Sequence, residues 1–291
     1  MTRVDLITGF LGAGKTTFIH RYLHHLRGEK VLVIENEFGS IGVDAQFLRD
    51  EGCPIEDLSG VCMCCRGRDQ FIGMLARAGA YDRVVVEPSG IYDVDEFFSV
   101  MAEPAVKAAC EIGCVVAVVD AHAPEKLSAE SAYLMITQLL AAGTVVVSKG
   151  FEGMEIGEWT RALVRSYGGE LEAELCVTPW DELTAADFVR FQQNGFRHGS
   201  HARMALSHED IYETFFTAPL CPDVPARIAE LMAQDGVLRA KGYLRDTERN
   251  YYQVNCTPWD LSVVPAPDVK RGLLVIIGQH LDEDALQAIL Y

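Results

Sequence analysis

The chain has 291 residues, a formal net charge of −17 at pH 7 and 49% hydrophobic residues. This length allows one large α/β domain and a second, smaller one, and the hydrophobic content excludes a disordered chain because it can fill buried cores. The acidic balance opposes the phosphate neutralisation that DNA and RNA binding requires, so we expect no nucleic-acid partner.

The first residues, 1–5, lead directly into an apolar strand pattern without the apolar core of a signal peptide. No uninterrupted apolar run in the sequence reaches about 18 residues, the length that a membrane-spanning helix needs. We therefore expect a cytoplasmic protein with no membrane partner.

A glycine-rich segment, GFLGAGKTT at residues 9–17, lies between this strand pattern and a helix pattern. It fits the phosphate-binding loop G-x-x-x-x-G-K-[ST] in spelling and in context. In such a loop, backbone N–H groups and the positive end of the helix converge on phosphate oxygens. The alternative interpretation of this segment is a glycine-rich turn that binds no ligand. Lys15 is predicted to reach the β- and γ-phosphates, and Thr16 to hold Mg²⁺. The predicted nucleotide contacts here are Gly9, Gly12, Ala13, Gly14, Lys15, Thr16 and Thr17.

Short apolar runs alternate with helix patterns from residue 1 to about residue 179. This alternation predicts an α/β fold with a mainly parallel sheet, that is, a P-loop NTPase domain. The predicted strands are residues 3–7, 30–35, 83–87, 114–120, 144–148 and 174–177. The predicted helices are residues 16–26, 68–79, 93–109, 131–142 and 158–168.

Two acidic residues, Glu37 and Asp44, follow the second strand in the segment ENEFGSIGVD. Ligands collect at the carboxyl edge of a doubly wound sheet, so Mg²⁺, water or a transition metal is a plausible contact for either carboxylate. A position on a surface loop is the alternative for each.

Three cysteines, Cys62, Cys64 and Cys65, lie within four positions. In a reducing compartment such thiols are core residues or metal ligands before they are disulfides. Neighbouring side chains diverge in regular structure, but a tight loop lets three thiols converge on one soft ion such as Zn²⁺. A fourth ligand must come from elsewhere, with Cys53 as one candidate, or the fourth position remains open to solvent or a partner. A purely structural role for the three cysteines is the alternative.

The third predicted strand ends in an acid, in the segment VVVEPSG. P-loop enzymes use a carboxylate at such a position to order Mg²⁺ or the attacking water. Glu87 is therefore predicted to be catalytic together with Lys15, and a solvated strand-end glutamate is the alternative. Ser89 and Gly90 are predicted to bring a backbone N–H near the γ-phosphate and to sense it.

The other histidines and cysteines give weaker signals. His122 follows a strand and is either a surface residue or a metal donor. His198 and His201 have the spacing of two donors on a helix, but their polar, glycine-containing setting favours linker residues. The cysteines predicted to be core residues are Cys110, Cys114, Cys176 and Cys256.

The pattern changes between residues 184 and 200, and the polar segment 192–201 predicts a connection. The predicted domains are residues 1–185, which bind the nucleotide, and residues 200–291, a smaller α+β domain of the usual size. The second domain is predicted to contain a helix over residues 224–235, strands over 237–244, 250–255 and 272–277, and a closing helix from about Asp282.

Taken together, these segments resemble the CobW-like metallochaperone GTPases. The resemblance covers nearly the whole chain, in order, through GFLGAGKTT, ENEFGSIGVD, the C-x-C-C motif, VVVEPSG, VVAVVDA, LRAKGYL and RGLLVIIG. It implies GTP binding and hydrolysis to GDP, coupled to delivery of Zn²⁺, or in other branches Co²⁺ or another ion, to a client metalloprotein or cofactor-biosynthesis enzyme. We expect a monomer or a weak homodimer. The residues that match family sites are Lys15, Thr16, Glu37, Cys62, Cys64, Cys65 and Glu87.

The chain departs from the family pattern at two points. Val61 stands where the family usually has glycine before the first thiol. Where the family has Asn-Lys-x-Asp to read guanine, this chain has Ser148-Lys149-Gly150-Phe151. Ser148 and Lys149 are still predicted to contact the nucleotide, but Phe151 cannot accept hydrogen bonds from the base. GTP therefore follows from the resemblance, and ATP stays open.

Two other functions fit the same residues. One is a nucleotide-gated chaperone for a cobalamin (corrinoid) or other metalloenzyme, in which the thiols only regulate. The other is a metal sensor or store without catalytic activity, in which the nucleotide is a structural ligand.

Overall fold

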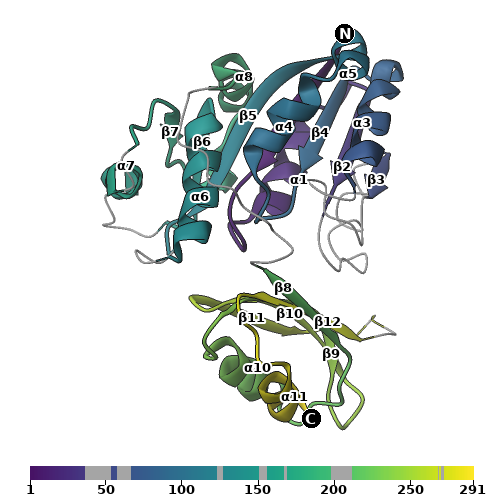
Figure 1. The fold of residues 1–291 in the computed structure, drawn as a ribbon, viewed down its shortest axis with the longest axis vertical. Helices are drawn as coiled ribbons and strands as arrows, with labels where there is room; N and C mark the ends of the chain where they lie inside the picture. Colours follow the sequence, from purple (N-terminus) through teal and green to yellow (C-terminus); the bar gives the residue numbers. More distant parts are fainter. Residues whose placement is uncertain are drawn as a thin grey trace. The chain divides into compact units, whose positions relative to one another are not determined.

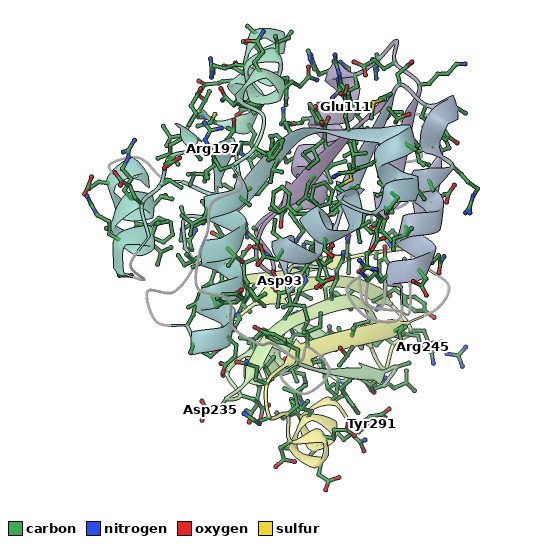
Figure 2. All side chains as sticks on the ribbon, turned by 45° about the horizontal axis from the view of Figure 1, so that its top comes forward. Asp93, Glu111, Arg197, Asp235, Arg245 and Tyr291 are labelled. Carbon is green, nitrogen blue, oxygen red and sulfur yellow. The ribbon has the colours of Figure 1, made fainter. Side chains whose placement is uncertain are left out.

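The computed structural model describes residues 1–36, 54–57, 67–122, 127–150, 156–166, 169–197, 212–267, 269 and 272–291. These residues form two compact units, one before residue 198 and one after residue 211 (Figure 1). Charged side chains lie on the surface of both, as Glu111 does in the first and Asp235 in the second (Figure 2). None of the helices described is both long and apolar enough to span a membrane. The domain limits 1–185 and 200–291 remain predictions.

The first unit is built on a parallel sheet with the strand order β3-β2-β4-β1-β5-β6-β7, as the α/β prediction requires. Strands β2, β4 and β6 are buried along their whole length, which suits apolar strands covered on both faces. The six predicted strands are confirmed with small differences at their ends, and the short edge strand β3 is an addition. The strands are β1 (Thr2–Thr8), β2 (Val31–Glu35), β3 (Ile55–Asp57), β4 (Arg83–Glu87), β5 (Cys110–Asp120), β6 (Thr144–Ser148) and β7 (Glu174–Cys176).

Helices follow most of these strands, and one predicted helix is divided. The segment 93–109 forms two helices because Pro104 begins the second, and Glu103 before it is extended, as a residue preceding proline prefers. The α-helices of this unit are α1 (Lys15–His25), α3 (Arg68–Ala76), α4 (Val94–Met101), α5 (Pro104–Ala109), α6 (Ala129–Ala141), α7 (Ile156–Ser166) and α8 (Ala185–Asn194). Two short 3₁₀ turns are η1 (Ala78–Ala80) and η2 (Trp180–Glu182).

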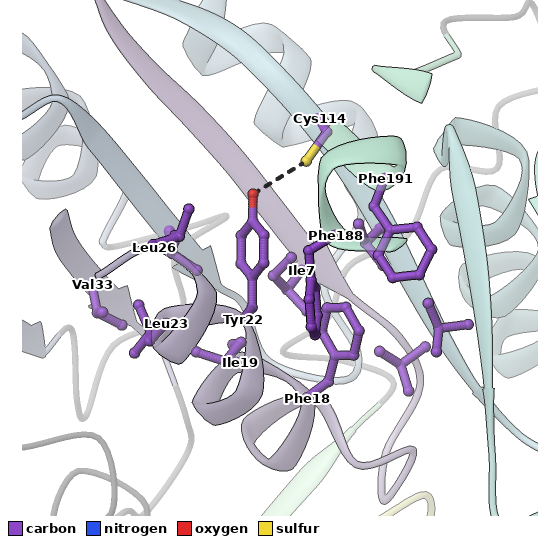
Figure 3. Packing of buried hydrophobic residues seen from close by; sticks show 14 of the residues in the cluster. Ile7, Phe18, Ile19, Tyr22, Leu23, Leu26, Val33, Cys114, Phe188 and Phe191 are labelled. Atoms are coloured by element: carbon purple, nitrogen blue, oxygen red, sulfur yellow. Dashed lines mark hydrogen bonds between the residues drawn. The ribbon is translucent and has the colours of Figure 1, made fainter. Parts of the chain in front are cut away.

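Helix α8 was not predicted and belongs to the core of the first unit. Its Phe188 and Phe191 are buried against Phe18 and Tyr22 of α1 (Figure 3). The helix continues to Asn194, so it includes the beginning of the segment predicted as a connection. The rings of α8 therefore hold the helix that starts at the glycine-rich loop.

A buried ion pair joins β1 to β4. Arg83 Nη1 donates to Asp5 Oδ2 over 2.6 Å, and these side chains are 2% and 0% exposed. Asp5 also accepts hydrogen bonds from the Tyr22 hydroxyl at 2.7 Å and from the Cys114 backbone N–H at 3.0 Å. Burial raises the pKa of Tyr22, and the neighbouring Cys114 and Asp5 raise it further, so the phenol stays a donor. One carboxylate thus ties together β1, α1, β4 and β5.

The second unit is an antiparallel sheet with the order β11-β10-β9-β12-β8 and two helices. Helices α10 and α11 pack side by side, and their apolar residues share one core with the sheet (Figure 1). The three predicted strands and both predicted helices are confirmed, and β8 and β11 are additions. The elements are β8 (Glu213–Thr217), α10 (Val224–Met232), β9 (Val237–Arg245), β10 (Tyr251–Thr257), β11 (Asp260–Pro265), β12 (Leu273–Gly278) and α11 (Glu283–Leu290).

Replacing Arg83 with methionine is expected to destabilise the first unit by about 3–5 kcal/mol, because Asp5 would remain as an uncompensated buried charge. The free energy of unfolding is measured by denaturant titration followed by circular dichroism. The control, Arg165→Met, removes an exposed ion pair with Glu158 and should cost at most about 1 kcal/mol. Equal losses in the two variants would contradict a special role for the buried pair.

Candidate functional site

The glycine-rich loop connects β1 to α1 at the carboxyl edge of the parallel sheet. Gly14, the residue before the helix, has a φ of +96°, a conformation that other residues rarely adopt. The first N–H groups of a helix have no partner within the helix, so the start of α1 is a place where an anion can bind. Thr17, in the first turn, is exposed. This part of the predicted site has the form that a phosphate-binding loop requires.

Lys15 lies across the loop that precedes it. Its side chain is buried, with 8% exposed, and Nζ donates to the carbonyl oxygen of Gly9 at 3.0 Å. The ammonium group is therefore held over the turn where phosphate oxygens are expected. The contact of Lys15 with the β- and γ-phosphates remains a prediction.

Thr16 and Glu87 meet although they are 71 residues apart in the sequence. Thr16 Oγ1 donates to Glu87 Oε1 over 2.8 Å, and Glu87 is buried at the end of β4. A hydroxyl and a carboxylate oxygen are the hard donors that Mg²⁺ prefers, so these residues fit that ion. The alternative of a solvated strand-end glutamate is wrong.

The turn after Glu87 packs directly on the glycine-rich loop. A Cβ atom on Gly90 would lie 2.6 Å from the backbone nitrogen of Leu11, so only glycine fits. Gln138 of α6 fixes this turn, because its Nε2 donates to the carbonyl oxygens of Gly90 at 3.3 Å and Tyr92 at 3.1 Å. Ser89 is buried in the same turn. The segment predicted to sense the γ-phosphate is thus in contact with the loop.

Lys149 links the end of β6 to the loop. Its Nζ donates to the carbonyl oxygen of Gly12 at 3.0 Å and pairs with Asp120 Oδ2 at 2.9 Å. The hydroxyl of Ser148 donates to the carbonyl of Val119 at 3.2 Å, within the sheet. His122 is exposed at the surface, and its imidazole Nδ1 lies 3.4 Å from Asp120 Oδ1. Lys149 is therefore well placed beside the loop, and Ser148 supports the strand end.

Three residues of the site were missed from the sequence. Asp120 had a signal, since it ends an apolar strand as Glu87 does. Gln138 had none, because it contacts the turn after Glu87 from a distant segment. Trp180 had none either, because its indole lies beside Gly14 only in the folded chain.

Several predicted residues lie outside the part of the chain that the structure describes, so their roles remain predictions. Within the described part, no group of three or more His, Cys, Asp or Glu side chains could hold a metal ion. The residues outside the described part are Glu37, Asp44, Cys53, Cys62, Cys64, Cys65, Phe151, His198 and His201.

The cysteines predicted to be core residues are confirmed. Cys110, Cys114, Cys176 and Cys256 are all buried. Burial raises the pKa of the Cys114 thiol, and the nearby Asp5 carboxylate raises it further, which disfavours the thiolate that metal binding needs.

Replacing Gly90 with alanine is expected to lower nucleotide turnover by at least about tenfold, because the new methyl group would displace a turn that must approach the γ-phosphate. Turnover is measured as phosphate release. The matched control is Gly79→Ala, where a Cβ atom meets nothing within 4 Å. Normal turnover in the Gly90 variant would exclude a role for the close contact with Leu11.

The loop, its lysine and the threonine–carboxylate pair define a P-loop nucleotide-binding protein. Residues 3–150 match the family described as "CobW/HypB/UreG, nucleotide-binding domain". Residues 216–291 match the "Cobalamin synthesis protein cobW C-terminal domain". The chain belongs to the CobW family.

Similarity to individual proteins extends through both units. The chain is 35% identical over 293 residues to the zinc chaperone YeiR of Escherichia coli K12, covering 96% of this chain and 84% of YeiR. It is 34% identical over 133 residues to the zinc chaperone CobW of Pseudomonas aeruginosa, covering 41% of this chain and 36% of that protein. The crystal structure of Zn(II)-bound YjiA GTPase from E. coli aligns with a TM-score of 0.49 and 22% identity, over 99% of this chain and 97% of that one.

Proposed function

We propose that this protein hydrolyses a nucleoside triphosphate and uses the cycle to deliver Zn²⁺ to a client metalloprotein or a cofactor-biosynthesis enzyme in the cytoplasm. The observation that carries the proposal is the Thr16–Glu87 contact, since phosphoryl-transfer enzymes use such a pair beside a P-loop to hold Mg²⁺ and the triphosphate. The metal is inferred from relatives that are zinc chaperones.

Each residue of the pair, and Lys15 beside it, has a separate task in the proposed reaction. Thr16 holds Mg²⁺, which supplies positive charge at the phosphates. Lys15 exchanges the Gly9 carbonyl for the β- and γ-phosphates and stabilises the charge that develops there. Glu87 orders the water around the ion or the water that attacks. In this proposal, catalysis depends on the positions of the phosphates and the water and on the positive charge around the phosphates.

The substrate is proposed to be GTP, with ATP as a second substrate. Lys149 is fixed beside the loop, where it can cover one side of a base. Phe151 replaces the aspartate whose carboxylate would pair with guanine, so hydrogen-bond discrimination against adenine is expected to be weak.

Zn²⁺ is proposed to bind the thiolates of Cys62, Cys64 and Cys65, with Glu37 as a neighbouring donor. Three thiolates with one further ligand suit tetrahedral Zn²⁺, and Co²⁺ or another transition metal can use the same donors.

The strand ends support coupling between this metal site and the nucleotide. In the sheet register, Glu35 of β2 pairs with Asp57 of β3 and with Glu87 of β4. The Asn36 N–H also donates to the Glu87 carbonyl at 2.8 Å. Strand β2, which precedes Glu37 in the sequence, and strand β3, which precedes the three thiols, therefore both end at the sheet edge that carries Glu87. A nucleotide that orders this edge can change metal affinity, and by linkage the metal changes nucleotide affinity.

Replacing Lys15 with alanine is expected to lower phosphate release by at least about a hundredfold, because the charge over the γ-phosphate is lost. Lys107→Ala, at an exposed lysine of α5, is the control and should keep normal turnover. Glu87→Gln should retain nucleotide binding and slow hydrolysis. Normal turnover of the Lys15 variant would refute the enzymatic proposal, and tight Zn²⁺ binding without turnover by the wild type would favour a metal sensor.

Zn²⁺ affinity is expected to differ by about 5- to 150-fold between the triphosphate and diphosphate states, the range of ordinary allosteric coupling. A competition titration with a chromophoric chelator measures it, with a non-hydrolysable GTP analogue or GDP present. Cys64→Ser should weaken binding in both states because one thiolate is lost. The control is Cys110→Ser, whose thiol donates to the Leu75 carbonyl as a serine hydroxyl also can. Equal affinities in the two nucleotide states would remove the coupling on which metal delivery depends.

A further inference from the structure

Trp180 lies against the glycine-rich loop, although 165 positions separate it from Lys15. It begins the turn η2, which follows β7 at the carboxyl edge of the sheet. Its Cη2 and Cζ3 atoms lie 3.0 and 3.4 Å from the position that a Cβ on Gly14 would occupy. Its ring also packs edge-on against Phe18, with centroids 5.9 Å apart. The indole is thereby held beside the residue that precedes Lys15.

Part of the Trp180 side chain is not involved in packing against the core. Trp180 is only partly buried, although it contacts the apolar core of the first unit. Its indole N–H is shielded from solvent and has no hydrogen-bond partner among the described residues. A buried donor without a partner is unfavourable, so a smaller apolar residue would serve a purely structural role better.

The position of Trp180 beside the glycine-rich loop indicates which part of a ligand it contacts. The phosphates of a nucleotide occupy the loop, and its sugar and base must extend along the same sheet edge. Lys149 at the end of β6 and Trp180 after β7 both touch the loop, through Gly12 and Gly14 respectively. These two side chains therefore flank the direction in which a base leaves the phosphates.

We propose that Trp180 contacts the nucleobase and stacks on it, which extends the nucleotide-binding part of the proposed function. An aromatic face stacks on any base, since every base has a π-face, and this contact needs no hydrogen-bond pairing. Trp180 thus supplies affinity for the base where Phe151 cannot supply discrimination. Guanine and adenine nucleotides gain from it alike.

The test compares ligands with and without a base. Trp180→Ala is expected to weaken binding of GDP and ADP by about 5- to 150-fold, the range of base–aromatic stacking. Binding of inorganic tripolyphosphate, which has no base, should stay within about twofold of wild type. Affinities are measured by isothermal titration calorimetry with Mg²⁺ present. Trp180→Phe, which keeps an aromatic face, should recover part of the loss.

A matched control and a second signal complete the experiment. Trp159→Ala changes a partly buried tryptophan of α7 and should leave all affinities unchanged. In the Trp159→Phe/Trp259→Phe variant, Trp180 is the only one of the three tryptophans that remains, and GDP should change its fluorescence more than tripolyphosphate does. Unchanged GDP affinity in folded Trp180→Ala, or an equal loss for tripolyphosphate, would overturn the proposal. Equilibrium binding needs no hydrolysis, so this result is independent of the turnover assay.

Discussion

The buried carboxylate of Asp5 is the constraint on which the nucleotide site depends. It lies in the strand that enters the loop, and its partners come from the helix that leaves the loop and from β4, which ends at Glu87. A charge buried in this way must keep its partners, because the interior offers no water to replace them. The two residues of the Thr16–Glu87 contact therefore lie on α1 and β4, the same elements that Asp5 connects through Tyr22 and Arg83.

The sequence predicts the first sheet well because its strands are covered on both faces. Runs such as Val84–Val86 are unambiguous when every residue must be apolar. The edge strand β3 has only three residues, Ile-Glu-Asp, and carries no such signal. Helix α8 had a local signal, since Thr184 and Asp187 form a capping box and two phenylalanines follow on one face. The helix was not predicted because its last residues belong to the polar segment 192–201, which was interpreted as a connection.

The site was predictable where its chemistry is local and not where it depends on tertiary contact. The loop motif identifies Lys15 and Thr16 directly, and an acid at a strand end identifies Glu87. The burial of Arg83 depends on Asp5, 78 residues away, and no pattern around either residue reveals the pair. Gln138 and Trp180 likewise become relevant only when α6 reaches the turn after Glu87 and η2 reaches the glycine-rich loop. Such residues need the fold before they can be assigned.

The carboxylates at the carboxyl edge of the first sheet make positive groups necessary if a nucleotide is to bind there. Glu35, Glu87 and Asp120 are buried at the ends of β2, β4 and β5, at the same edge of the sheet, although a polyanionic ligand is expected there. Lys149 offsets Asp120, and Lys15 lies over the loop. The carboxylate of Glu87 still opposes the γ-phosphate unless a cation lies between them. In the proposed function, Mg²⁺ at Thr16 beside Glu87 supplies this cation, so we expect this edge to favour the Mg²⁺-bound form of the nucleotide.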